Sequence, residues 1–315
     1  MPINSKILLL GSSGFVGFNL ARYLCSKGFY VAGLSRTLPK FSLPSSFHYR
    51  HICSDIENLQ AFHDEFLDCS LVIDCAYSPI EDKNVCKSPN PDVLRASKSL
   101  AYCLQAAADN NVKKYIYLSS GGAVYGQQLA KFNHKEDDFC SPISKYGYSK
   151  LICENVCNYF DRLSSMDVFI VRPSNLYGPY SLPTRTSGVI NVFAKNLLTN
   201  STIKIFGDPS RISKDYIFID DFCVLIERLI CYNGSYKIFN FSSGQITNLS
   251  TIMSLIEKSV GSKFTFDQFS ALTNDVQSFA LDNTRLTSEL GSFSYTPISI
   301  GINRTICWLK EQLNK

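Results

Sequence analysis

ILLLGSSGFVGFNLARYL, residues Ile7–Leu24, joins a run of apolar residues to an amphipathic stretch through three glycines. Glycine destabilises a helix by about 1 kcal/mol relative to alanine, so three of them where a helix begins need a physical reason. Gly11 allows a tight turn, Gly14 lets a pyrophosphate approach the backbone, and Gly17 brings the helix close to the preceding strand. The stretch therefore predicts a dinucleotide-binding turn; the alternative is a glycine-rich turn that only caps a helix.

Short apolar runs and helical stretches alternate beyond this unit. Such alternation is typical of a parallel sheet covered by helices on both faces, and we predict an α/β, Rossmann-type doubly wound fold. Residues 1–175 form its NAD(P)-binding domain, and residues 176–315 form a smaller α/β substrate lobe, interleaved with the core near the boundary. Strands are predicted at residues 6–10, 30–34, 71–75, 114–118, 168–171, 203–206 and 237–241, and helices at 15–27, 92–110, 145–163, 188–198, 220–231 and 249–260, with a last helix at the C-terminus.

Composition excludes several classes of protein. The chain has 315 residues and a net charge of +4, and its basic residues are scattered rather than gathered in the stripe of a nucleic-acid binder. We expect no membrane span, because no apolar run approaches eighteen residues, and a cytoplasmic location, because the N-terminus has no signal-peptide core. The twelve cysteines are expected to be mostly buried thiols, and the four histidines lack the spacing of metal ligands.

Four further motifs follow the glycine turn in the order SDI, YLSSGGAVYG, PISKYGYSKLICE and VRPSNLYGP, beginning at Ser54, Tyr117, Pro142 and Val171. The segments IKIFGD and KDYIFIDD come later, from Ile203 and Lys214. Together with the G-x-x-G-x-x-G spacing, they resemble the extended branch of the short-chain dehydrogenase/reductase superfamily. That branch comprises nucleotide-sugar epimerases, dehydratases and reductases.

The resemblance implies a catalytic centre on the Tyr-x-x-x-Lys helix. Tyr146 would exchange a proton with a sugar hydroxyl or ketone while hydride moves to or from the nicotinamide. Lys150, four residues later on the same helix face, would favour the phenolate and hold the nicotinamide ribose. Ser120 would orient the reacting oxygen; Ser119 is the alternative, because Gly121 stands where many relatives carry the hydroxyl. The glycines also supply none of the acid that dehydratases use, which argues against dehydration.

The residues after the second strand bear on the cofactor. Ser35 stands where an NAD enzyme usually carries an acidic residue, and Arg36 can bind a 2′-phosphate bidentately, so we favour NADP, with NAD or dual use open. The predicted cofactor site also includes Phe15 and Val16 at the helix start. The resemblance adds Asp55 and Ile56 beside the adenine.

The second half of the chain carries the substrate residues that the resemblance implies. Asn175 would reach the diphosphate and Phe206 would pack near the nucleotide base. Lys214 replaces the usual arginine, keeping the charge but not the forked geometry, which Arg211 or Arg285 could supply.

These residues favour an NAD(P)H-dependent reductase of a nucleoside-diphosphate 4-keto-6-deoxyhexose, such as dTDP-4-dehydro-6-deoxyglucose, in the synthesis of surface polysaccharide such as the O-antigen of lipopolysaccharide. The runner-up is a UDP-hexose 4-epimerase with tightly bound NAD. A non-catalytic NADP sensor or scaffold is the third hypothesis, although Tyr146 and Lys150 are both present. Relatives imply a homodimer paired through two helices. The segments 80–91 and 181–188 are expected to select the sugar.

Overall fold

A seven-stranded parallel sheet forms the centre of the computed structural model, which describes residues 6–76, 92–127, 133–181, 183, 188–272 and 276–314. The strand order is β10–β6–β5–β4–β1–β2–β3, and every neighbouring pair is parallel. The strands are β1 (Lys6–Leu10), β2 (Tyr30–Ser35), β3 (Tyr49–Cys53), β4 (Cys69–Asp74), β5 (Lys114–Leu118), β6 (Asp167–Pro173) and β10 (Ile238–Phe241). The order reverses beside β1, which is where open α/β sheets bind their ligands. The predicted Rossmann-type fold is confirmed.

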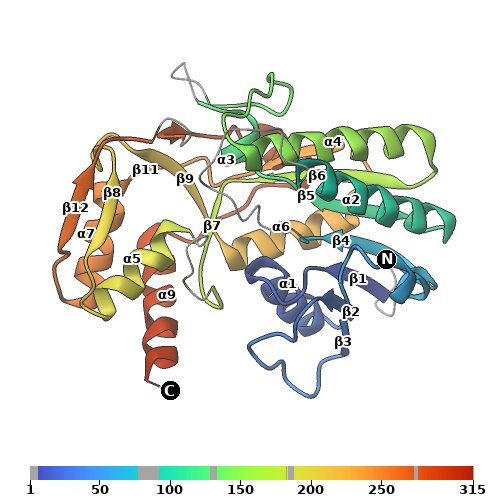
Figure 1. Cartoon of the computed structure of the whole chain (residues 1–315), viewed down its shortest axis with the longest axis horizontal. Helices are drawn as coiled ribbons and strands as arrows, with labels where there is room; N and C mark the ends of the chain where they lie inside the picture. Colours follow the sequence, from blue (N-terminus) through green and yellow to red (C-terminus); the bar gives the residue numbers. More distant parts are fainter. Residues whose placement is uncertain are drawn as a thin grey trace.

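Alternation along β1 explains why helices cover both faces. Ile7 and Leu9 belong to the core beneath α1 (Phe15–Ser26) and α6 (Ile219–Cys231). Leu8 and Leu10 belong to the opposite core, beneath α2 (Asp92–Asp109) and α4 (Lys145–Leu163). Both sets are fully buried, so the strand is a continuous apolar run. Figure 1 shows the two helix layers on either side of the sheet.

The second half of the chain returns to the large sheet and also forms a smaller lobe. Its α6 and β10 belong to the large sheet and the helix layer on it, although both follow residue 175. The division into two domains at residue 175 stays a prediction. The lobe has its own apolar core, which includes Ile203, Ile252 and Ile306. Its elements are β7 (Asn175–Tyr177), α5 (Val189–Leu198), β8 (Ile203–Phe206), β9 (Ser213–Phe218), β11 (Ile246–Asn248), α7 (Leu249–Val260), β12 (Phe266–Phe269), β13 (Ser278–Phe279) and α9 (Ile298–Leu313).

The predicted elements are present with ends that differ by a few residues. The first helix ends at Ser26, because Lys27 is its C-cap, and β4 begins at Cys69, before the predicted strand. Two short helices, α3 (Gly121–Val124) and α8 (Thr284–Leu290), were not predicted, since four and seven residues are too few to show a helical period. The described cysteines are free thiols, of which the buried ones are Cys25, Cys69, Cys103, Cys153, Cys157 and Cys223.

Candidate active site

The glycine turn closes on the strand ends because its residues lack side chains. Gly11 has a left-handed φ of 78°, and a Cβ there would lie 2.8 Å from the Ala76 backbone nitrogen. A Cβ on Gly17 would lie 2.2 Å from the Gly11 carbonyl oxygen. A methyl group at Gly11 would therefore push the turn away from the end of β4. A methyl group at Gly17 would push α1 away from the turn. This arrangement fits the close backbone approach that a pyrophosphate needs.

Helix α1 begins as an anion site would. Gly14 is its N-cap and provides no side-chain cap, and the first turn carries no acidic residue. Phe15 and Val16 occupy that first turn, so their backbone N–H groups and the helix dipole favour a negative charge there.

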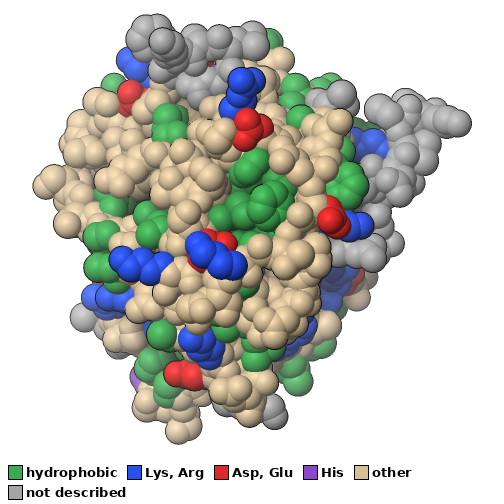
Figure 2. Space-filling view, turned by 90° about the vertical axis from the view of Figure 1, so that its left-hand side faces the viewer, with side chains coloured by type: hydrophobic (Ala, Val, Ile, Leu, Met, Phe, Trp, Pro, Cys, Tyr) green, Lys and Arg blue, Asp and Glu red, His purple; other side chains and the backbone are tan. Residues whose placement is uncertain are grey.

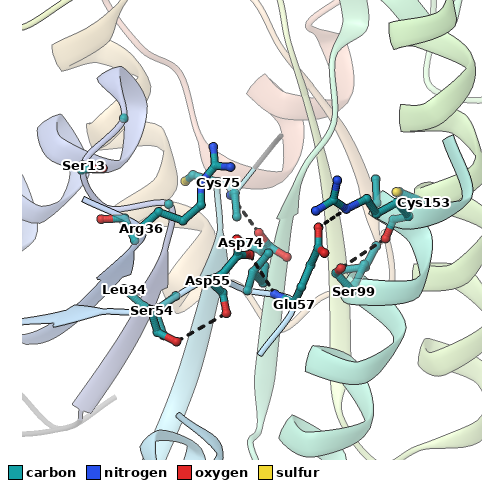
Figure 3. Close-up of a pocket in the computed structure, with 18 of the residues that line it drawn as sticks. Ser13, Leu34, Arg36, Ser54, Asp55, Glu57, Asp74, Cys75, Ser99 and Cys153 are labelled. Atoms are coloured by element: carbon teal, nitrogen blue, oxygen red, sulfur yellow. Dashed lines mark hydrogen bonds and ion pairs between the residues drawn. The ribbon is translucent and has the colours of Figure 1, made fainter. Parts of the chain in front are cut away.

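A cavity of about 680 Å³ opens beside this turn, at the carboxyl ends of β1 to β4 (Figure 3). Of the predicted cofactor residues, Gly11, Gly14, Ser35, Arg36, Asp55 and Ile56 line it. Among the residues that the structure describes, the rest of the lining is Ser13, Leu34, Thr37, Ser54, Glu57, Asp74, Cys75, Ala76, Arg95, Ala96, Ser99, Leu100, Tyr117 and Cys153. The place and size of the cavity suit a dinucleotide.

The rim at β2 has a serine where a carboxylate is usual, and a basic residue follows it. Ser35 is buried, and its hydroxyl donates to the Thr37 carbonyl oxygen at 3.0 Å. Arg36 is exposed and extends over the cavity (Figure 3). Across from it, Asp55 accepts a hydrogen bond from the Glu57 backbone, and Glu57 pairs with Arg95. Sequence reasoning missed the Glu57–Arg95 pair, because its members lie on separate segments.

Helix α4 is capped and packed so that Tyr146 stands in its first turn. The Ser144 side chain caps the helix by accepting from the Gly147 backbone N–H at 3.1 Å. A Cβ on Gly147 would lie 2.3 Å from the Ala123 carbonyl oxygen, so glycine lets α4 rest directly on α3. Tyr146 is 37% exposed and therefore open to a reactant.

Lys150 anchors α4 to the carboxyl end of β5. Its Nζ donates to the Leu118 carbonyl oxygen at 2.6 Å and lies 4.7 Å from the centre of the Tyr117 ring. The lysine is 3% exposed, and Tyr117 lines the cavity. Cys153 of the same helix also lines the cavity, whereas Tyr146 and Lys150 do not. Tyr146 stands one turn before Lys150 on α4.

The two candidate serines after β5 have different environments. The Ser119 hydroxyl is buried and donates to Glu154, whose carboxylate forms an ion pair with Arg172 at 2.7 Å. Ser120 is partly exposed at the N-cap of α3 and makes no side-chain capping bond. The geometry thus favours Ser120 over Ser119 for orienting a reactant.

Packing explains the glycines that follow. A Cβ on Gly121 would lie 2.5 Å from Leu281 Cδ1, and one on Gly122 would lie 2.8 Å from Phe279 Cζ. Both neighbours are buried side chains that follow or belong to β13. Residues of the lobe therefore fill the space that a side chain would need at Gly121 and Gly122.

Asp74 is a buried acid at the end of β4 that the sequence analysis did not single out. It accepts hydrogen bonds from the Tyr115 hydroxyl at 2.7 Å and from the Ala76 backbone at 2.9 Å. Burial raises the pKa of Asp74, and these two bonds and the Lys150 charge oppose that shift. An aspartate ending an apolar strand was the available sign of a polar site.

The three predicted substrate residues lie on the lobe rather than in the cavity lining. The Asn175 amide donates to the Asp215 carbonyl oxygen at 3.0 Å, which ties β7 to β9. Phe206 is 37% exposed and stacks on Phe269 of β12, with ring centres 5.4 Å apart, so Phe269 is an aromatic neighbour that sequence reasoning missed. Lys214 lies on β9, partly buried. Figure 2 shows apolar side chains gathered on the face that carries β8 and β12, among scattered charges.

Both arginines considered as a source of the forked geometry that Lys214 lacks lie beside carboxylates. Arg285 pairs with Asp137 and, at 3.7 Å, with Glu136. Arg211 is 88% exposed on its side chain and lies 3.7 Å from Asp208. The predicted sugar-selecting segments lie largely outside the described residues, which leave out 77–91, 182 and 184–187.

The described part of the chain has neither a membrane-spanning helix nor a cluster of metal ligands. No helix there has the length and apolar character to cross a membrane. Within the same residues, no group of three or more histidines, cysteines or carboxylates could hold a metal ion.

A glycine turn, a cavity where the strand order reverses and a Tyr–Lys helix are typical of nicotinamide-dependent enzymes of the Rossmann type. The chain belongs to the NAD dependent epimerase/dehydratase family, whose model matches residues 7–241. This confirms the resemblance to the extended short-chain dehydrogenases/reductases.

Curated relatives of nearly equal length are named for different reactions. A UDP-glucose 4-epimerase of Mycolicibacterium smegmatis is 29% identical, covering 98% of this chain and 99% of its own. A dTDP-4-dehydro-6-deoxyglucose reductase of Escherichia coli is 25% identical over 95% and 96% of the two chains. Identity at this level leaves the reaction of this chain open.

Solved structures match the whole fold. MoeE5 in complex with UDP-glucuronic acid and NAD has a TM-score of 0.87 at 23% identity, covering 98% of this chain and 99% of its own. The UDP-glucose 4-epimerase of Thermotoga maritima, solved with UDP-glucose, has a TM-score of 0.86 at 23% identity with the same coverage. These likenesses confirm the fold.

Proposed function

We propose that the protein is an NADPH-dependent 4-ketoreductase acting on a nucleoside-diphosphate 4-keto-6-deoxyhexose in the synthesis of a surface polysaccharide. The observation that carries the proposal is the rim of the cavity, where Arg36 is exposed and the neighbouring β2 residue is the buried Ser35. A guanidinium there stabilises a 2′-phosphate, and no carboxylate ends β2 to repel it. A reductase exchanges its cofactor in each turnover, which suits the reduced phosphorylated form.

The cavity fits a dinucleotide. The cramped turn at Gly11 and Gly17 and the uncapped start of α1 would hold the pyrophosphate. Asp55 and Ile56, which line the cavity, would contact the adenine. Lys150, held at the end of β5, would hold the nicotinamide ribose. When bound, the nicotinamide supplies hydride chemistry.

Tyr146 would then exchange the proton at the sugar oxygen. The 37% exposure of its side chain and its place one turn before Lys150 suit that role, and Ser120 would hold the same oxygen by a hydrogen bond. Asn175 and Lys214 would serve the diphosphate, and Phe206 the base. The paired glycines at 121 and 122 provide no acid, which disfavours loss of water from the sugar.

A 4-epimerase with retained NAD is the second candidate. Its support is the relative named UDP-glucose 4-epimerase, which is 29% identical over 98% of this chain. Such an enzyme would use the same Tyr146 in both directions.

Release of bound nucleotide separates the two candidates. Freshly purified protein is denatured and the supernatant is analysed by mass spectrometry, then native protein is assayed with NADPH and dTDP-, CDP-, GDP- and UDP-4-keto sugars. Traces of NADP or an empty site, with NADPH oxidation, support the reductase. Stoichiometric NAD, with interconversion of UDP-hexoses and no net oxidation, would replace it with the epimerase.

A further inference from the structure

The connection between β2 and β3, residues 36–48, links the cavity rim to the C-terminal lobe. It begins with Arg36 and Thr37, which line the cavity. Four residues after Thr37, the Phe41 ring packs against the core of the lobe rather than against the large sheet. One end of this connection therefore faces the cofactor site, and its middle touches the other half of the molecule.

Phe41 lies in a group of four rings that we call the aromatic cluster: Phe18, Phe41, Tyr180 and Trp308. The centre of the Phe41 ring is 5.6 Å from Phe18, 5.3 Å from Tyr180 and 5.5 Å from Trp308. Tyr180 is in turn 5.1 Å from Phe18 and 5.4 Å from Trp308. The rings come from α1, the β2–β3 connection, the turn after β7 and α9, which are far apart in the sequence (Figure 1). Tilted and edge-on pairs at these separations add stability beyond burial alone.

The Tyr180 side of the aromatic cluster is held in place independently of Phe41. Tyr180 has a left-handed φ of 64°, which a bulky residue adopts only where its surroundings enforce it. Arg22 of α1 lies 5.4 Å above its ring, and the fully buried Asn19 donates to the Pro179 carbonyl oxygen at 3.1 Å. Phe41 therefore docks on a platform that α1 and α9 already fix.

We propose that Phe41 is a positioning residue for the cofactor, because its docking in the aromatic cluster holds Arg36 and Thr37 at the cavity rim. The inference rests on the proposed function, since it takes the cavity as the cofactor site. Near the rim, local hydrogen bonds reach the backbone of the connection and the Thr37 hydroxyl. The Ser35 hydroxyl donates to the Thr37 carbonyl oxygen at 3.0 Å, the Ser13 and Thr37 hydroxyls lie 3.5 Å apart, and Cys53 Sγ lies 3.3 Å from the Arg36 carbonyl oxygen. Without Phe41, residues 36–48 would be more mobile in the nucleotide-free protein. Nucleotide binding would then have to order Arg36 and Thr37, and the conformational entropy lost would weaken the affinity. The lobe thereby contributes to cofactor affinity through a residue that does not line the cavity.

The first experiment measures NADPH and NADH affinity by calorimetry for the wild type and Phe41→Ala. The expected result is a Kd for NADPH raised about tenfold, with kcat at saturating nucleotide within about twofold of wild type. Phe41→Leu keeps an apolar contact, so its Kd for NADPH should lie between those of wild type and Phe41→Ala. It replaces the alanine variant if that variant fails to fold. Leu38→Ala is the matched control, because Leu38 is 69% exposed in the same connection.

The second experiment changes Trp308, whose ring packs against Phe41. Trp308→Leu in α9 is expected to raise the same Kd, and the Phe41→Ala/Trp308→Leu pair to raise it no further than the larger single loss. Trp308 is the single tryptophan of the chain, so its emission in wild type should also shift when NADPH binds. Unchanged affinity in the Phe41 variants, or an equal loss in Leu38→Ala, would overturn the inference while leaving the proposed function intact. A wild type that binds neither nucleotide would instead overturn the proposed function.

Discussion

Tyr146 is the single side chain whose loss tests the proposed proton transfer most directly. We expect Tyr146→Phe to lower kcat by at least about a hundredfold, because positioned acid–base groups contribute about 10²–10⁴. The ring is kept, so the melting temperature should stay near that of wild type. Steady-state kinetics with the accepted sugar nucleotide measure the effect. Tyr148→Phe, two residues later and 56% exposed, is the control, and equal activity of both variants contradicts the role of Tyr146.

Arg36 carries the argument about cofactor choice. Arg36→Ala is expected to lower the ratio of kcat/KM for NADPH over NADH about tenfold or more, because a charge-assisted hydrogen bond to the 2′-phosphate is lost. Activity with NADH should change little. Lys40→Ala removes another exposed positive charge from the same connection and should leave the ratio unchanged. A ratio that is the same in wild type and Arg36→Ala disproves the contact.

At the scale of elements, a buried carboxylate joins β9 to the turn after β10. Asp215 accepts from the Ser242 and Ser243 hydroxyls and from the Gly244 backbone N–H. Burial raises the pKa of Asp215 from 3.8 to about 6, against the effect of these bonds. The folded state therefore keeps a proton between about pH 4 and pH 6 that the unfolded chain releases. Its contribution to the free energy of unfolding is present below pH 4 and is lost as the pH rises through 6.

Asp215→Asn should remove this dependence. From pH 4 to 6.5, the free energy of unfolding should fall more in wild type than in the variant, by about 2 kcal/mol. Urea unfolding at both pH values measures the difference. Asp267→Asn, at an exposed position on β12, should retain the wild-type slope. Parallel slopes for wild type and Asp215→Asn would show that this carboxyl does not govern the change.

For the whole molecule, we propose that two copies pair through α2 and α4. These helices pack together and leave large apolar side chains exposed, among them Leu94, Tyr102, Tyr159 and Leu163 at 47–68%. Tyr159→Glu with Leu163→Glu should convert a dimer to a monomer by light scattering, because charges in an apolar interface lose hydration without a partner. Ile300→Glu on α9 should leave the mass unchanged. A wild type that is already monomeric refutes the pairing.

The sequence alone determined the sheet, the glycine turn and the Tyr–Lys helix. Each is a local pattern: a continuous apolar run in β1, glycines at positions 11, 14 and 17, and a four-residue spacing from Tyr146 to Lys150. Such patterns act within one or two elements, so they are visible along the chain.

Only the tertiary structure decided which groups face each other. In the folded protein Ser119 bonds to Glu154 and Ser120 is partly exposed. Leu281 fills the space beside Gly121, and Phe41 packs against Trp308. The tertiary structure also paired Arg285 with Asp137, away from the role considered for it beside Lys214. The physical reason is that these contacts join segments far apart in the sequence, whose packing depends on the whole chain having folded.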